Sequence, residues 1–178
     1  MRRSFLSSFV FILSCGFALA QAQYKGLWNF GGAGDGISPK GTLVADAAGN
    51  LYGTTLYGGT GGNCANYCGT VYELSPSANG WTETVLYTFC YQANCTDGAD
   101  PWAGLILDHS GNLYRTTIAG GTGLLGTVFE LSPPAQTGGA WTQQTPWSAL
   151  IADKAGNLYG LAGVGGAYNK GVVFGIAP

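Results

Sequence analysis

Short apolar runs alternate with polar turns along most of the chain, and one such pattern occurs three times. Apolar residues at 43–45, 105–107 and 150–152 each lead into an aspartate, and Gly-Asn-Leu-Tyr follows at 49–52, 111–114 and 156–159. Short apolar runs bounded by Asp, Gly and Asn are typical of β-strands. The pattern therefore predicts two antiparallel strands joined by a D-x-x-G-N turn, whose aspartate accepts backbone N–H groups and whose Gly-Asn pair tolerates positive φ.

Further segments repeat after each turn. Gly-Thr-Val-Tyr-Glu-Leu-Ser-Pro at 69–76 returns, with Phe for Tyr, at 126–133 and in a shorter form at 171–174. Trp-Thr occurs at 81–82 and 141–142, Leu27–Phe30 matches Leu86–Phe89, and Asp35-Gly36 matches Asp97-Gly98. Four short strands in about 45–60 residues are typical of a β-propeller blade. We expect an all-β fold of about three propeller-like, antiparallel four-stranded blades; a β-sandwich is the alternative, but it would leave the repetition unexplained.

The N-terminus is predicted to be a signal peptide. Arg2 and Arg3 precede an apolar run that ends in Ala-Leu-Ala at position 20, and this order of features is typical of that segment. We expect residues 1–20 to be removed and residues 21–178 to form the repeat domain of a secreted or cell-surface protein. The alternatives are an uncleaved anchor helix, for which the run is short, and lipid attachment at Cys15, although the apolar run continues beyond it.

Four cysteines follow the predicted cleavage site: Cys64, Cys68, Cys90 and Cys95. An even number of cysteines in an exported chain favours disulfides, and three pairings are possible. A metal site with C-x3-C and C-x4-C ligand pairs is the alternative, although zinc sites usually have tighter spacing. Both pairs lie in insertions relative to the other copies of the repeat, in loops.

Composition agrees with this architecture and excludes some partners. The chain has 31 Gly and only 9% charged residues, which is too much glycine for a helical bundle. Removal of Arg2 and Arg3 changes the formal net charge from −2 to −4. We expect no nucleic-acid partner, because the chain has no basic cluster, and no membrane insertion after the signal peptide is removed.

Taken together, G-N-L-Y-G-T-T, G-T-V-Y/F-E-L-S-P, W-T-E-T-V-L-Y-T-F and D-G-A-D-P resemble the Gloeo/Verruco (GloVer) tandem repeat over nearly all of residues 24–178. The resemblance implies an exported bacterial repeat protein and supplies no catalytic residues to carry over; many members carry a C-terminal surface anchor. This chain departs from the pattern: it holds about three repeats, ends at Pro178 without an anchor segment and is shortened between Trp141 and Pro146. Propellers usually have at least four blades, so we expect an incomplete ring or one closed between two copies as a homodimer.

Loops at one end of the predicted blades form a candidate binding face. In a four-stranded meander, the loops between the second and third strands and those between successive blades share one end, which both cysteine insertions would decorate. Binding residues concentrate in loops on a rigid scaffold. The candidate ligand-binding residues there are Asp35, Asp97, Asp100, Trp102, Tyr91 and Tyr57. The alternative is that the recurrent D-G-x-x-P sequence only shapes turns.

No catalytic, cofactor-binding or metal-binding residues are predicted. His109 is the only histidine and is expected to be an exposed turn residue, so no Ser-His-Asp or Cys-His pair is available. The repeated turn aspartates supply one carboxylate per turn, where calcium takes six to eight oxygens, and are expected to cap turns. Glu73 and Glu130 share a repeat position, which explains them better than a glycosidase carboxylate pair.

We favour an exported, non-catalytic β-repeat protein that acts as a cell-surface or extracellular binding module for glycans or surface proteins. Aromatic stacking and aspartate hydrogen bonds would make the contacts. One alternative is a propeller-type lyase, lactonase or glycosidase that uses Asp97 or Asp100 with a metal ion on extracellular carbohydrate or lactone. The other is a truncated repeat protein without independent activity.

Overall fold

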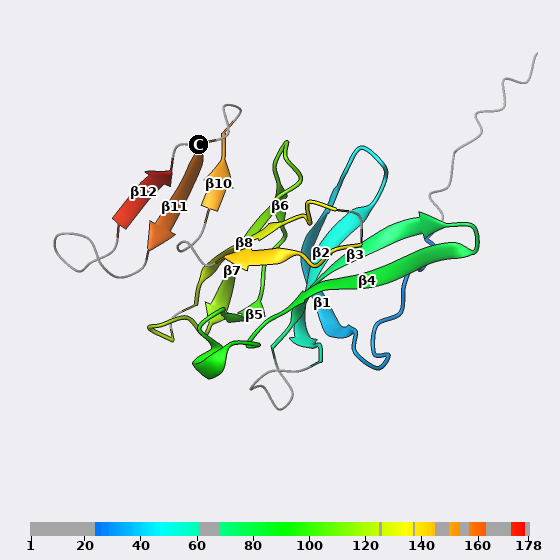
Figure 1. Cartoon of the computed structure of the whole chain (residues 1–178), viewed down its shortest axis with the longest axis horizontal. Coiled ribbons are helices and arrows are strands. Elements are labelled where there is room, and N and C mark those ends of the chain that lie inside the picture. The colour runs from blue at the N-terminus through cyan, green and yellow to red at the C-terminus, as the bar shows by residue number, and fades with distance from the viewer. Residues whose placement is uncertain are drawn as a thin grey trace, which may run out of the picture.

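The computed structural model describes residues 24–60, 68–124, 126–136, 138–144, 150–153, 157–162 and 172–176. These residues form antiparallel sheets that follow one another along the chain (Figure 1). The fold is all-β, as predicted: apart from one turn of 3-10 helix, η1 (Ala93–Cys95), the described residues contain no helix, and hence none that could cross a membrane. The predicted signal peptide, residues 1–20, lies outside the described residues.

The first sheet has the strand order β1-β2-β3-β4 of the predicted blade. Its strands are β1 (Gly36–Ala45), β2 (Leu51–Gly58), β3 (Thr70–Ser77) and β4 (Gly80–Thr88). The sequence predicted only the apolar end of β1, whereas the strand begins at Gly36 and pairs along all of β2, with a bulge between Lys40 and Val44. Proline and glycine in this half of β1 concealed it from the apolar pattern.

The second sheet repeats the first with one change. It contains β5 (Ala99–Pro101), β6 (Ile106–Leu107), β7 (Leu113–Ala119), β8 (Val128–Ser132) and β9 (Thr142–Gln144). β5 and β6 pair with opposite ends of β7 and together take the place of β1: Pro101 pairs with Thr117 as Pro39 pairs with Thr55.

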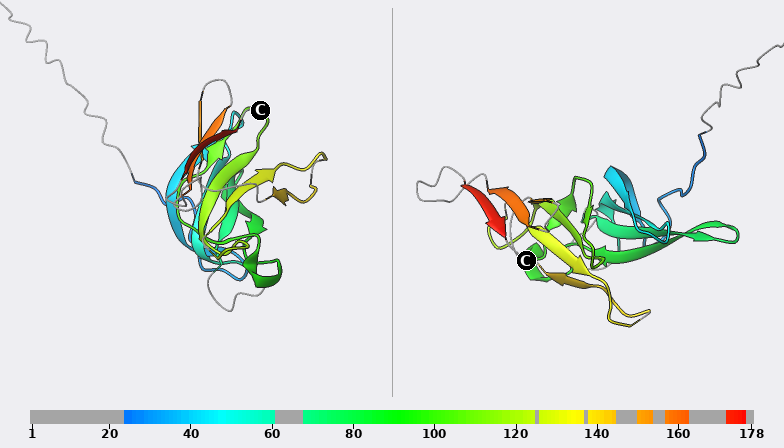
Figure 2. Two further views of the ribbon diagram at one scale, coloured as in Figure 1. Left: turned by 90° about the vertical axis from the view of Figure 1, so that its left-hand side faces the viewer. Right: turned by 90° about the horizontal axis from the view of Figure 1, so that it is seen from above.

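The third sheet has the order β10-β11-β12. Its strands are β10 (Leu150–Ala152), β11 (Leu158–Ala162) and β12 (Val172–Ile176). The described parts of the three sheets do not close into a ring (Figure 2). The four residues from Leu27 to Phe30, which the repeat predicts as a lone outer strand, form no strand within the described structure.

Each D-x-x-G-N turn is built around its aspartate. Asp46 Oδ1 accepts hydrogen bonds from the backbone N–H groups of Ala48 and Asn50, both at 2.9 Å. Its Oδ2 accepts from the side chains of Asn50, at 2.8 Å, and Tyr52, at 3.0 Å. Asp108 repeats the set with Ser110, Asn112 and Tyr114, and Asp153 repeats the bonds from Asn157 and Tyr159. The predicted turn capping is confirmed, and the bonds explain why Asn and Tyr recur with the aspartate.

These bonds stabilise the ionised form of the turn aspartates. Burial acts to raise the pKa of Asp46, but the hydrogen bonds from Asn50, Tyr52 and Ala48 outweigh it and hold the pKa below its ordinary value. The same balance lowers the pKa of Asp108. A carboxyl whose pKa is lower in the folded chain stabilises the fold above its unfolded pKa, about 3.9, and loses that contribution as the pH falls through the folded pKa.

The first two sheets enclose a shared apolar core. It includes Val71, Phe89, Leu113, Phe129 and Leu131, all fully buried. Phe89 follows β4 of the first sheet, and its ring meets Phe129 of the second sheet edge to face, with centroids 4.8 Å apart. The chain thus crosses between the sheets through the core.

A threonine pair fixes the neighbouring end of each sheet. The hydroxyls of Thr55 and Thr70 are 2.8 Å apart, and those of Thr117 and Thr127 are 3.0 Å apart; both pairs are buried. The glycine of the D-G sequence packs on this pair, since a Cβ at Gly98 would lie 2.5 Å from Thr127 Oγ1. The repeated threonine pair and the glycine of the repeated D-G sequence therefore both serve to pack this end of the sheet.

We expect Asp108→Ala to lower the free energy of unfolding by about 2 kcal/mol at neutral pH, because two backbone N–H groups and two side chains lose a charged acceptor. His109→Ala, an exposed position in the same turn, should leave it unchanged. Denaturant titration followed by tryptophan fluorescence measures both. The loss in Asp108→Ala should shrink below about pH 4; a loss that persists in acid would contradict the role of the ionised carboxylate.

Candidate functional site

The loops at one end of the first two sheets lie together. We call this end the loop face and define it by residues 31–35, 57–60, 68–69, 89–102 and 119–124. Gly59 N donates to the Asp35 carbonyl, at 3.0 Å, in the first sheet. Asp100 N donates to the Cys68 carbonyl, also at 3.0 Å, and so joins the loops of the two sheets. Backbone hydrogen bonds therefore fix the loops to one another.

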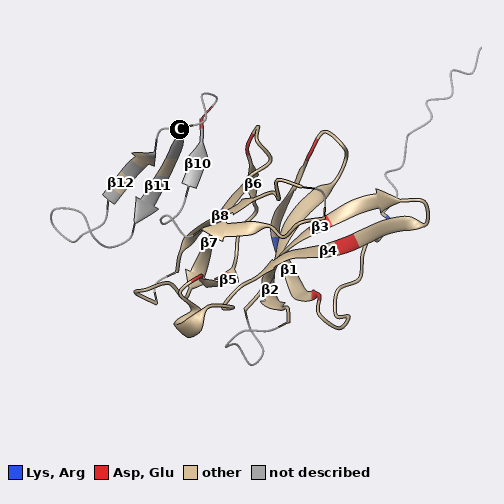
Figure 3. Ribbon diagram, viewed as in Figure 1, with Lys and Arg blue, Asp and Glu red and all other residues tan. Residues whose placement is uncertain are grey.

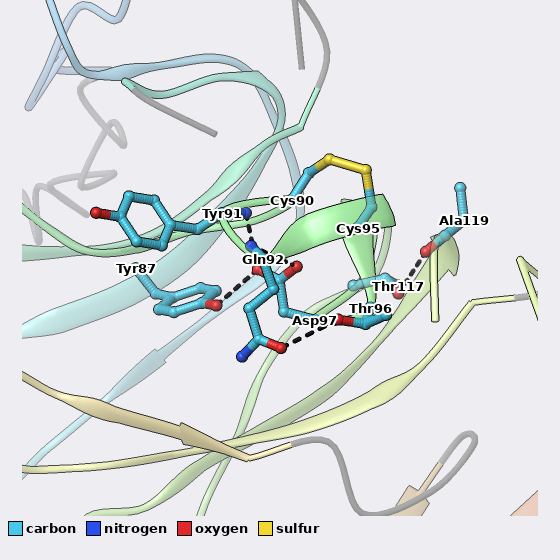
Figure 4. The surroundings of a disulfide bond; sticks show 9 residues. All are labelled: Tyr87, Cys90, Tyr91, Gln92, Cys95, Thr96, Asp97, Thr117 and Ala119. Atoms are coloured by element: carbon cyan, nitrogen blue, oxygen red, sulfur yellow. Dashed lines mark hydrogen bonds between the residues drawn. A yellow bond between two sulfur atoms is a disulfide. The ribbon is translucent and has the colours of Figure 1, made fainter. Parts of the chain in front are cut away.

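Asp97 organises the loop between β4 and β5 (Figure 4). Its side chain is fully buried and accepts at Oδ2 from the Tyr87 hydroxyl, at 2.7 Å, and from the Tyr91 amide, at 2.9 Å. Oδ1 accepts from the Gln92 amide at 3.2 Å. Burial and the bond to Asp97 raise the pKa of Tyr87, which keeps the hydroxyl a donor at neutral pH. In the described structure this predicted ligand-binding residue is enclosed and holds the loop together.

A disulfide between Cys90 and Cys95 closes the same loop (Figure 4). It is one of the pairings that the sequence left open. Both cysteines have positive φ, 58° and 52°, a region that residues other than glycine seldom adopt. Cys68 is also disulfide-bonded, and Cys64 lies outside the described residues. Two cross-links of different kinds, the disulfide and the buried carboxylate, constrain this loop.

Two of the predicted residues present aromatic rings to solvent. Tyr91 is 68% exposed and Trp102 is 53% exposed. The amide of Tyr91 is held by Asp97, so its ring stands on a constrained backbone. Lys40 Nζ lies 5.4 Å from the centre of the Trp102 ring, a cation–π contact between the sheets. Sequence reasoning did not single out Lys40. The one indication in the sequence was that Lys40 occupies the repeat position of Trp102.

Asp100 has a carboxylate oxygen without a hydrogen-bond partner. Its Oδ1 is buried and unpaired, and burial raises the pKa of its carboxyl. The backbone is left-handed there, with a φ of 57°, as it is at Ser38, the equivalent residue of β1, with a φ of 63°. Burial of a polar group without a partner is unfavourable, so Asp100 gains from any donor that reaches it.

A cavity of about 700 Å³ opens beside the disulfide loop. It is lined by Ala93, Asn94, Cys95, Thr96, Gly121, Thr122 and Leu124. Its volume falls in the range of small-molecule sites, about 300–1,000 Å³. Sequence reasoning did not predict this lining, part of which (Ala93, Asn94, Cys95 and Thr96) lies in an insertion that has no counterpart in the other repeats.

Asp35 and Tyr57 lie at the loop-face end of the first sheet. The Asp35 carboxylate accepts from the Gly31 amide, at 3.0 and 3.3 Å, and Tyr57 pairs with Ile37 near the start of β1. The predicted residues thus divide between the sheets, with Asp97, Asp100, Tyr91 and Trp102 in the second.

The charged residues of the described chain are dispersed over turns and strands (Figure 3). Burial, with a contribution from Asp35, raises the pKa of Glu83 on β4, and burial lowers the pKa of Arg115 on β7. Within the described ranges, no three His, Cys, Asp or Glu side chains lie close enough to hold a metal ion. The described loop face presents the exposed rings of Tyr91 and Trp102.

A second cavity, about 670 Å³, lies at the opposite end, between the aspartate turns of the first two sheets. Tyr52 and Trp141, which help to line it, have ring centroids 6.3 Å apart. His109, also in its lining, is exposed, as predicted. The aspartates of both turns already accept a full set of hydrogen bonds. The loop face, where Asp100 lacks a partner, is the better candidate.

A family model described as the Gloeobacter/Verrucomicrobia repeat matches residues 15–138. This span exceeds half of the chain and includes every strand from β1 to β8. No curated protein and no solved structure matches the chain.

We expect Asp97→Asn to lower the free energy of unfolding by about 2 kcal/mol, because an amide places a donor among three donors that need a charged acceptor. Asp35→Asn is the matched control: it has the same repeat position but accepts only from the Gly31 amide, and we expect a small effect. Thermal and denaturant unfolding measure both. Equal losses in the two variants would show that burial of Asp97 does not matter.

Proposed function

We propose that the chain, which belongs to the Gloeobacter/Verrucomicrobia repeat family, is an exported, non-catalytic binding module whose loop face recognises extracellular glycans. The observation that carries the proposal is that Tyr91 and Trp102 both present exposed rings and that the Tyr91 amide is held by Asp97. Flat, exposed aromatic rings stack on the apolar faces of sugars, and a fixed backbone reduces the entropy lost on binding.

Polar groups beside these rings support the same class of ligand. Asn94, Thr96 and Thr122 line the cavity beside the disulfide loop, and their side chains can exchange hydrogen bonds with sugar hydroxyls. None of the described residues that line this cavity is charged, which suits a neutral polyol.

Export is supported by the cysteines and by the N-terminal pattern. Disulfides persist in oxidising compartments, and both Cys90–Cys95 and Cys68 are disulfide-bonded. The charged start and the apolar run before Gln21 match the pattern of a signal peptide.

Trp102→Ala and Tyr91→Ala should each weaken binding to a soluble polysaccharide by about tenfold, the loss expected for one stacked aromatic. A glycan microarray selects the polysaccharide, and titration calorimetry measures the affinity. Tyr24→Ala, which removes an exposed ring from the N-terminal segment, should bind like the unaltered chain. All three variants should keep the melting temperature.

Two results would count against glycan binding at the loop face. Binding that both loop-face variants retain would move the site elsewhere, and binding to a surface protein without any glycan would replace the ligand class. Turnover of a lactone or glycoside that stops on addition of a chelator would favour the enzyme alternative.

Secretion through a signal peptide predicts a processed chain with a defined first residue. The full chain expressed in a bacterial host should appear outside the cytoplasm with Gln21 as its first residue, because the small residues before that position form the cleavage site. Intact-mass analysis and N-terminal sequencing measure this, and a full-length chain retained in the cytoplasm would refute it.

A further inference from the structure

We propose that two copies of the chain associate head to tail: the first sheet of each copy packs on the third sheet of the other, as the second sheet packs on the first within one chain. The segment from Leu27 to Phe30 would also add an outer strand to β12 of the partner copy. This proposal concerns assembly and is independent of glycan binding.

The contact between the first and second sheets provides the template. On the side of the second sheet that faces the first, Leu105 is 4% exposed and Ala99 is 6% exposed, and both belong to the shared core. Val71 of β3, on the first sheet, belongs to the same core and is 0% exposed. These positions mark the two halves of a sheet-to-sheet contact.

The first sheet exposes the same positions that the second sheet buries. Leu43 matches Leu105 in the repeat and is 47% exposed; Ile37 matches Ala99 and is 52% exposed. Apolar side chains that are buried in one repeat and exposed at the equivalent positions of the next indicate a missing neighbour.

Within the described residues, no sheet covers the corresponding side of the third sheet. Val173 of β12 occupies the repeat position of Val71, and it is 73% exposed. The first sheet therefore exposes one half of the sheet-to-sheet contact, and the third sheet exposes the other half. A second copy of the chain satisfies both ends at once.

The N-terminal segment from Leu27 to Phe30 has the sequence of an outer strand, but it has no partner strand among the described residues. Leu27–Phe30 matches Leu86–Phe89, the segment in which β4 pairs with β3 through Tyr87 and Val71. Phe30 packs edge to face on Tyr72 at 4.8 Å, as Phe89 does on Phe129. Within the described residues, this segment pairs with no strand.

β12 provides an edge on which this segment can pair. In the described structure it pairs only with β11, on one edge, and Figure 1 shows it at the outer side of the third sheet. Transfer of the β3–β4 register places Trp28 of one copy opposite Val173 of the other. Unpaired strand edges invite such additions.

Two copies would bring six sheets together, within the range of about four to eight blades that close a propeller. When a surface of one copy contacts a different surface of the next copy, the assembly closes into a ring if the rotation that relates the copies allows it.

Light scattering on the purified full chain should give the mass of two copies. Leu43→Glu and Val173→Glu, at the two halves of the contact, should each reduce the mass to one copy, because either charge would be buried without a partner. Leu124→Glu, at an apolar side chain on the loop face that is 69% exposed, should remain at two copies. Circular dichroism should show the same fold in all three variants.

A pair of introduced cysteines tests the strand addition separately. Trp28→Cys combined with Val173→Cys should give a covalent two-chain species on non-reducing gels, since directly opposite residues of paired strands lie about 5 Å apart at Cβ. Trp28→Cys combined with Leu124→Cys is the control and should not. A one-copy mass for the unaltered chain, a two-copy mass that survives both glutamate variants, or equal cross-linking in the two cysteine pairs would overturn the proposal.

Discussion

The edge-to-face contact between Phe89 and Phe129 is the interaction on which the rest of the described structure depends. A single sheet of short strands is marginally stable, because much of its apolar surface stays in water. Phe89 leaves the first sheet and is buried in the second, so the two sheets cannot separate without exposing it. The same residue is bonded through its amide to the Gly69 carbonyl at 3.0 Å, which ties the core to the loop face.

The position of the disulfide loop follows from this anchor. Cys90 is the next residue along the chain and is fully buried, and its amide donates to the Gly98 carbonyl at 2.9 Å. The loop thus starts and ends at fixed points, and the carboxylate of Asp97 fills the space between them. A buried carboxylate with three donors stays in place only if its surroundings are rigid, and the core provides that rigidity.

Repetition made most of the fold predictable, and departures from it made the site hard to predict. The strand pairs, the aspartate turns and the shared end of the loops all follow from motifs that occur at least twice. The first half of β1 was missed because its pairing with β2 depends on tertiary contacts: Gly36 is buried against Thr55, which no local pattern reveals. The burial of Asp97 and the partial exposure of Asp35, two aspartates in the same motif, likewise depend on loop length and not on residue type.

Positions where the two complete sheets differ are those free to serve binding. Asp46 and Asp108 must be aspartates because each holds four hydrogen bonds in its turn, and a change there costs the fold. Lys40 and Trp102 share a repeat position, yet neither side chain is required by the strand pairing around it. The fold therefore tolerates a cation at one site and a large aromatic ring at the other, and it brings them 5.4 Å apart across the junction of the sheets. A repeat scaffold of this kind separates the residues that fix its geometry from those that are free to vary, and the second repeat, with its inserted loop, carries more of the latter.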